Sequence, residues 1–146
     1  MYKNILIPLD GSQLAESALP HGESLALIYG ATLHLLRVAR PPTLTGREFE
    51  GPEQFQLEMD MQRNEAEQYL KGIAGKFREK KIAVAFHVGY GPVVAEIIDT
   101  AERQNVDMVV IASHGRTGLS KVFFGSVAVG VLNRIERPLM IIRASG

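Results

Sequence analysis

The sequence has no cysteine, no excess of either charge and no long apolar run. Without cysteine, disulfide bonds, thiolate metal sites and cysteine nucleophiles are excluded. Lys and Arg number 16, and so do Asp and Glu, so the formal net charge is zero. A general nucleic-acid binder usually carries a clear basic excess, and we therefore expect no nucleic-acid partner. A small anionic ligand is compatible with this balance because a few local donors can hold one.

From the sequence we expect neither a signal peptide nor a membrane-spanning helix. No apolar run approaches the roughly 20 residues that a membrane-spanning helix needs. Met1 leads directly into the apolar run Ile5–Ile7, without the basic region and long apolar stretch of a signal peptide. We therefore expect a cytoplasmic protein with no membrane partner. Its 146 residues, 46% of them hydrophobic, favour one domain over residues 1–146.

Short apolar runs alternate with longer segments of helical periodicity. The runs predict strands at 3–9, 32–38, 82–88, 107–112 and 138–143. The periodic segments predict helices at 13–29, 53–80, 92–104 and 126–136. Nearly continuous apolar strands are typical of a parallel sheet covered on both faces. The alternation predicts a single-domain α/β fold, a doubly wound five-stranded parallel sheet with right-handed crossovers and helices on both faces.

Particular residues sharpen these helix predictions. Pro20 lies inside the first helical pattern and should kink or locally loosen it. Ile28 in the first pattern and Phe55 in the second fall on the apolar faces that we expect to meet the core. Pro92 is a favoured first helical residue, and Ser126 is a good N-cap for the last helix.

The segment 112–127 carries the strongest functional signal. It connects a predicted strand to a helix and contains Gly115 and Gly125, which let the backbone turn tightly and approach a ligand. Unpaired amides at the start of the last helix, near Gly125 and Ser126, favour an anion such as phosphate. Arg116 is a further candidate donor, or else a solvated charge. The alternative interpretation of the whole segment is a structural turn that serves packing.

A second candidate element is Pro8-Leu9-Asp10, at the end of the first strand. Ligands of doubly wound sheets bind beyond the carboxyl ends of the strands. The Asp10 carboxylate could accept hydrogen bonds from ribose hydroxyls or help to hold a phosphate-bound Mg²⁺. Asp-Gly-Ser is also ordinary turn chemistry, so Asp10 could equally be a turn former or helix cap. Backbone groups near Val38, at the end of the second strand, could contact an adenine edge.

Taken together, the segment S-H-G-R-T-G-L-S with G-S-V-A after it, the opening I-L-I-P-L-D-G-S and the ending R-P-L-M-I-I-R resemble the universal stress protein family over essentially the whole chain. The resemblance implies strand order 3-2-1-4-5. It implies that the ligand is ATP, which could be bound together with Mg²⁺. ADP or AMP could take the place of ATP. Residues matching Asp10 and Val38 would hold the ribose and adenine. Those that would surround the ribose and phosphates are Ala112, Gly115, Gly125, Ser126 and Val127.

The resemblance further implies a homodimer formed through the last strand, 138–143. An apolar edge strand independently favours pairing with a second copy. We expect a nucleotide-dependent regulator of the stress response, with a regulatory protein partner that the sequence does not identify, and not an enzyme. Ala112 stands where the family motif has its first glycine, and Ala128 stands where a hydroxyl would help a phosphate. The alternatives are a dimeric interaction module without nucleotide and a slow ATPase.

Overall fold

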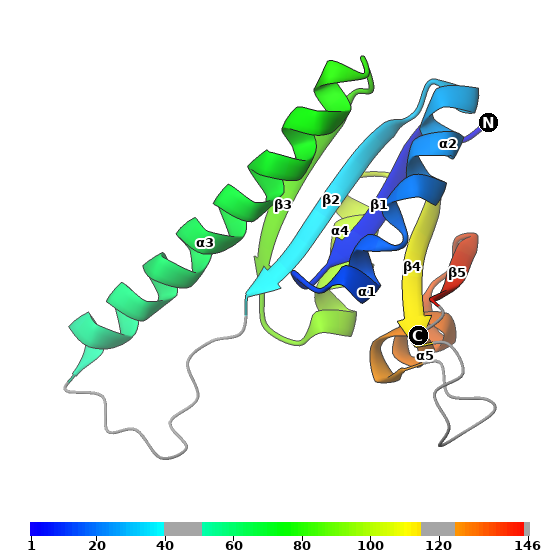
Figure 1. Ribbon diagram of the computed structural model, residues 1–146. Helices are drawn as coiled ribbons and strands as arrows, with labels where there is room; N and C mark the ends of the chain where they lie inside the picture. The colour runs from blue at the N-terminus through cyan, green and yellow to red at the C-terminus, as the bar shows by residue number, and fades with distance from the viewer. Residues whose placement is uncertain (40–50, 115–124, 145–146) are drawn as a thin grey trace.

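The computed structural model describes residues 1–39, 51–114 and 125–144 (Figure 1). These residues form a five-stranded parallel sheet in the order β3-β2-β1-β4-β5. The predicted α/β class, the parallel sheet and the strand order are therefore confirmed. Chain order gives the elements β1 Asn4–Leu9, α1 Gln13–Glu16, α2 Leu19–Tyr29, β2 Thr32–Ala39, α3 Pro52–Glu79, β3 Val84–Tyr90, α4 Val93–Arg103, β4 Met108–His114, α5 Ser126–Arg134 and β5 Leu139–Ala144.

The first predicted helix is divided into α1 and α2. The Ser12 side chain caps α1 by accepting a hydrogen bond from the Ala15 amide at 3.1 Å. Helix α1 ends at Glu16, and α2 restarts with Pro20 in its first turn. A proline is tolerated there because the amide that it lacks would have had no helical partner. The loosening predicted near Pro20 is thus confirmed as a complete break before it.

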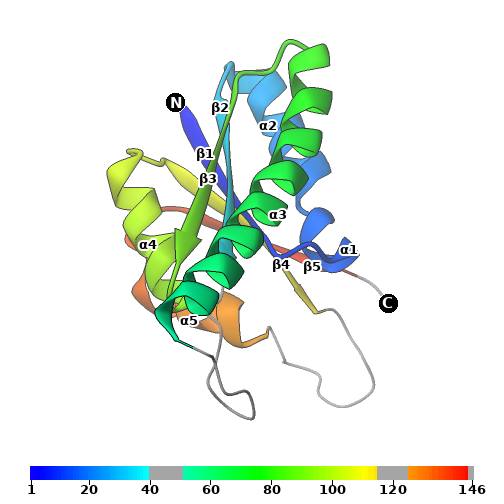
Figure 2. The ribbon, with the colours of Figure 1, turned by 90° about the vertical axis from the view of Figure 1, so that its left-hand side faces the viewer.

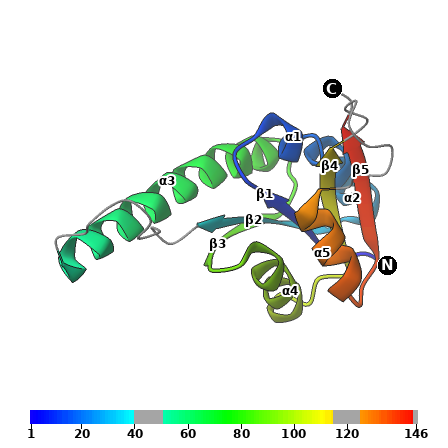
Figure 3. The same cartoon turned by 90° about the horizontal axis from the view of Figure 1, so that it is seen from below.

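The helices cover the sheet in two layers, with α1, α2 and α3 on one face and α4 and α5 on the other (Figures 2 and 3). Alternate residues of the central strands point to opposite layers. Ile7 and Leu35 are buried beneath α2 and α3, whereas Leu6 and Leu36 are buried beneath α4 and α5. Both faces of the central strands are therefore apolar, as the nearly continuous apolar runs predicted.

Helix α3 is longer than the sheet face that it covers. Its second half packs on the core, whereas its first half extends past the edge of the sheet (Figure 1). The prediction that Phe55 faces the core is therefore wrong, since 36% of the residue is exposed. The same prediction fails for Ile28 of α2, which is 72% exposed because the buried stripe of that helix follows Gly22 and Ala26 instead.

Neither a membrane span nor a metal cluster was found in the described part of the molecule. None of its helices is both long and apolar enough to cross a bilayer. No group of three or more His, Cys, Asp or Glu side chains among these residues is placed to hold a metal ion.

Candidate ligand-binding site

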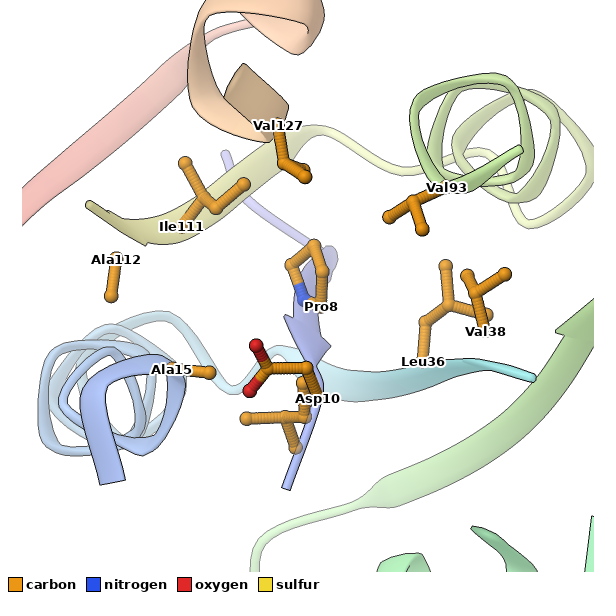
Figure 4. Close-up of a pocket in the computed structure, with 10 residues that line it drawn as sticks. Pro8, Asp10, Ala15, Leu36, Val38, Val93, Ile111, Ala112 and Val127 are labelled. Atoms are coloured by element: carbon orange, nitrogen blue, oxygen red, sulfur yellow. The ribbon is translucent and has the colours of Figure 1, made fainter. Parts of the chain in front are cut away.

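A cavity of about 150 Å³ opens at the carboxyl ends of β1, β2 and β4 (Figure 4). The chain leaves β1 toward β2 on one side and returns through β4 on the other, so the strand order reverses here. Doubly wound sheets bind their ligands at this reversal. The lining residues are Pro8, Leu9, Asp10, Ala15, Leu36, Val38, Val93, Ile111, Ala112 and Val127.

Most of the residues singled out in the sequence meet at this cavity. Six of them line it, namely Pro8, Leu9, Asp10, Val38, Ala112 and Val127. Gly125 and Ser126 adjoin it at the start of α5, although neither is among its lining residues. Gly115 and Arg116 lie outside the described residues.

Four lining residues were missed in the sequence: Ala15, Leu36, Val93 and Ile111. Leu36 could have been found, because it lies two positions before Val38 and therefore on the same face of the strand. Val93 opens α4 directly after the turn at Gly91 and Pro92. Its contact with the cavity depends on how α4 docks on the sheet, and no local pattern contains that information.

Asp10 forms a turn, which is one of the two roles that the sequence left open. One carboxylate oxygen, Oδ1, accepts hydrogen bonds from the Ser12 amide at 2.9 Å and from the Ser12 hydroxyl at 2.5 Å. These bonds form the turn that leads into α1. The other oxygen, Oδ2, has no partner among the described residues. Asp10 therefore shapes a turn and, as far as the described residues go, presents a second carboxylate oxygen without a partner at the mouth of the cavity (Figure 4).

The N-terminus of α5 borders the same cavity through Val127. The prediction of Ser126 as N-cap is wrong: Gly125 occupies that position and Ser126 is the first helical residue. The φ of Gly125 is 75°, in the left-handed region that favours glycine. Within the described residues no side chain caps this helix, and the first amides and dipole of a helix favour an anion.

Two alanines replace expected motif residues, and both side chains are engaged in packing. Ala112 borders the cavity, but its methyl group points toward the α1 side and packs with the core beneath α1, α2 and α3 (Figure 4). Ala128 is 3% exposed and belongs to the core beneath α4 and α5. A hydroxyl at position 128 would therefore enter the core, and its absence removes no group from the cavity.

Ser113 is a polar residue at this end of the sheet that sequence analysis missed. It is 2% exposed, and its hydroxyl has no hydrogen-bond partner among the described residues. An unpaired buried polar group costs free energy. It lies in β4 beside Ala112, where a ligand or an ordered water at the strand end could satisfy it. No sequence pattern distinguishes this serine from an ordinary strand residue.

Helices α4 and α5 form the wall that closes the cavity on one side, through Val93 and Val127. The two helices approach closely at Gly130. A methyl group on Gly130 would lie 2.7 Å from Cγ2 of Val94, well inside the ordinary contact distance between carbon atoms. The spacing of this wall therefore depends on glycine at position 130.

A second polar cluster lies nearer the amino end of the sheet. His34 Nε2 is 2.9 Å from Asn4 Oδ1, and His34 Nδ1 is 3.0 Å from His87 Nε2. Because the Asn4 amide nitrogen donates to the Asn105 carbonyl at 3.4 Å, Oδ1 is the acceptor and His34 donates to it. Burial, reinforced by the charge of His87, lowers the pKa of His34 below its usual value. Burial and then the Arg103 charge lower the pKa of His87.

The sheet, the position of the cavity and the adjoining helix N-terminus define a doubly wound α/β protein of the class that binds ligands at the strand ends. Within this class, the chain belongs to the universal stress protein family, whose model matches residues 1–143. The resemblance seen in its motifs is thereby confirmed.

Individual relatives agree with this assignment. Universal stress protein MJ0531 of Methanocaldococcus jannaschii is 27% identical over 143 residues, which cover 98% of this chain and 83% of that protein. The solved structure of the hypothetical protein MJ0577, from the same organism, superposes with a TM-score of 0.81 and 28% identity over 99% of this chain and 97% of that one. A universal stress protein from Archaeoglobus fulgidus, solved in complex with dAMP, has a TM-score of 0.69 and 20% identity, covering 97% and 98% of the two chains.

Proposed function

We propose that residues 1–146 form one nucleotide-binding domain that holds ATP, with Mg²⁺, or ADP or AMP in the cavity at the strand ends. The observation that carries this proposal is the convergence at one place of an apolar cavity, the Asp10 carboxylate and the N-terminus of α5, the last two with an oxygen and first amides that no described side chain occupies. The dAMP bound by the Archaeoglobus relative supports the same ligand class. Gly115 and Arg116 stay in the proposed site on the strength of the family motif alone.

Each part of the proposed ligand has a chemically matched surface. The apolar walls, including Leu36, Val38 and Val93, suit a flat adenine ring. The free Asp10 oxygen would accept hydrogen bonds from ribose hydroxyls. The amides that follow Gly125 at the start of α5 would bind phosphate oxygens. Mg²⁺ would arrive bound to the phosphates, since this ion is commonly held by substrate phosphates and one or two carboxylates.

Calorimetric titration with Mg-ATP, ADP and AMP tests this site, together with mass analysis of any nucleotide released from the purified protein. Val127→Trp should abolish the binding heat because the indole would occupy the cavity. Asn133→Trp is the matched control on the same helix, because Asn133 is exposed and does not line the cavity. Wild-type protein that gives no heat at millimolar nucleotide would contradict the proposal.

We further propose that the protein acts as a homodimer formed through β5, whose conformation or partner binding the nucleotide regulates. Strand β5 lies at one edge of the sheet. Exposed apolar edges favour pairing with another chain. Helix α5 lies next to β5 (Figure 3). Val129 and Leu132 of α5 are exposed apolar residues. Sedimentation analysis should give twice the chain mass, and a monomer at every concentration would contradict the dimer.

Asp10 is the one carboxylate among the described lining residues. Phosphoryl transfer depends on the precise placement of metal ions and of a base or water-orienting residue. We therefore assign the site to binding and regulation and expect any ATP hydrolysis to be slower than about 1 s⁻¹, the low end of typical enzyme turnover. A colorimetric phosphate assay on purified protein measures this directly.

A further inference from the structure

Arg37 lies directly behind the proposed nucleotide site. It precedes Val38 in β2, and successive strand side chains point to opposite faces. Val38 lines the cavity, so Arg37 points to the face that α1 and α3 cover. There its guanidinium carbon lies 4.9 Å from the ring centroid of Tyr69 in α3. A guanidinium at this distance over an aromatic face makes a cation–π contact, which joins β2 to α3.

Tyr69 is itself fixed by a third element. Its hydroxyl donates a hydrogen bond to Glu16 Oε2 at 2.9 Å, and Glu16 is the last residue of α1. Burial of the phenol, followed by the hydrogen bond and charge of Glu16, raises the pKa of Tyr69 above its usual range. The hydroxyl therefore stays protonated and keeps donating. Glu16, Tyr69 and Arg37 thus form a continuous cluster across α1, α3 and β2.

The Arg37 guanidinium, at one end of this cluster, packs against the turn that carries Asp10. Gly11 has a φ of 88°, and a methyl group on it would lie 2.8 Å from Nη1 of Arg37. The guanidinium is therefore packed against the Gly11 backbone. Gly11 stands between Asp10 and Ser12, the two residues whose hydrogen bonds at 2.9 and 2.5 Å define the turn. Arg37 supports this turn from the side opposite the cavity.

We propose that Arg37 is a positioning residue for Asp10. Held by Tyr69 and Glu16, its planar guanidinium fixes the Asp10–Ser12 turn so that the free carboxylate oxygen stays at the cavity mouth. The identity of the ligand rests on the proposed function, whereas the support of the turn does not. Because Tyr69 belongs to α3, the proposal implies that the stability of α3 affects ligand binding at Asp10. The same coupling means that ligand binding stabilises α3 in return.

The first experiment measures ligand affinity. Arg37→Gln removes the charge and the stacked plane, and should weaken Mg-ATP binding about fivefold, the scale of a partly desolvated cation–π contact. Arg63→Gln is the matched control, because Arg63 is an exposed α3 arginine that pairs with Glu67 at 3.1 Å. In an Asp10→Asn background, Arg37→Gln should change affinity less than about twofold, since coupled residues are not additive. Fully additive effects would overturn the proposal.

The second experiment needs no ligand. Hydrogen exchange in the free protein should be faster over residues 11–15 in Arg37→Gln than in Arg63→Gln, while β4 exchanges equally in both. Arg37→Lys keeps the charge without the planar stack and should exchange at an intermediate rate; it also carries the measurement should the glutamine variant not fold. If wild-type protein binds no nucleotide, the proposed function fails and exchange still decides the role of Arg37. Equal exchange in the variants of Arg37 and Arg63 would overturn it.

Discussion

The two ends of the sheet differ in how completely their polar side chains are paired. At the amino end, Asp107 Oδ2 accepts from the Lys3 and Asn4 amides at 2.7 and 2.8 Å, and the Asn4 side chain continues into the pair His34–His87. At the carboxyl end, Asp10 keeps one free oxygen and the Ser113 hydroxyl has no partner in the described part of the chain. Polar groups that bond to one another stabilise a fold, whereas a buried polar group left unpaired needs an explanation, of which a bound ligand or an ordered water is one.

The largest effect is expected when a member of the amino-end cluster is removed. His34→Ala leaves Asn4 and His87 without their partner and opens space in the core, so it should lower the free energy of unfolding by about 2–4 kcal/mol. Urea denaturation measures this loss. His21→Ala, at an exposed position on α2, is the control and should stay within about 0.5 kcal/mol of wild type. Similar stability in the two variants would contradict a structural role for the amino-end cluster.

At the unpaired end, the expected effect is on binding and not on stability. Asp10→Asn keeps an oxygen for the Ser12 amide but weakens the acceptor offered to a ribose hydroxyl. Mg-ATP affinity should fall about tenfold, or 1.4 kcal/mol, with the unfolding free energy nearly unchanged. Asp60→Asn, on the exposed side of α3 where Asp60 accepts from Gln56 at 3.0 Å, should bind as wild type does. A destabilised Asp10→Asn variant with normal affinity would reverse the assignment.

Acid should act on the paired end. The pKa values of His34 and His87 are lowered in the folded protein by burial, with the charges of His87 and Arg103 as second causes. Below about pH 6.5 these two histidines bind protons in the unfolded chain more readily than in the folded protein. The free energy of unfolding should therefore be constant above that pH and fall below it, by less than about 1.4 kcal/mol per pH unit for each histidine. Urea titrations from pH 8 to 5 measure the slope, and His87→Gln should reduce it. A flat profile would contradict the histidine contribution.

The smallest effect is expected at Ser113. Its hydroxyl bonds to no described residue, so Ser113→Ala should leave the free energy of unfolding unchanged or raise it by up to about 1 kcal/mol. Ser12→Ala is the matched comparison, because Ser12 caps α1 and bonds Asp10, and its loss should cost about 1 kcal/mol. A Ser113→Ala variant less stable than Ser12→Ala would show that the buried hydroxyl is paired.

Local patterns in the sequence were sufficient to predict the strands and many of the residues that line the cavity. Each strand was predicted to within about two residues because its apolar run is short and bounded. Asp10 and Val38 were found because both follow or end such runs. Phe55 and Ile28 were misplaced because periodicity identifies an apolar face but does not say how far the sheet extends beneath it. Ser126 was misplaced because the left-handed φ of Gly125 decided the cap.

Contacts between elements distant in the sequence were not predictable. His34 and His87 lie 53 positions apart and meet only because β2 pairs with β3. The contact of Arg37 with Tyr69 likewise depends on the docking of α3 over the sheet. In both cases sequence spacing carries no information because the tertiary register sets the distance.

Gly130 determines how wide the cavity is between α4 and α5. Val93 and Val127 face the ligand space from α4 and α5, and Gly130 allows these helices to approach until one further methyl group would collide with Val94. A change at position 130 would therefore widen the gap between the two valines without altering any residue that lines the cavity. Relatives of this protein could evolve toward larger or smaller ligands through a residue on the rear side of the wall.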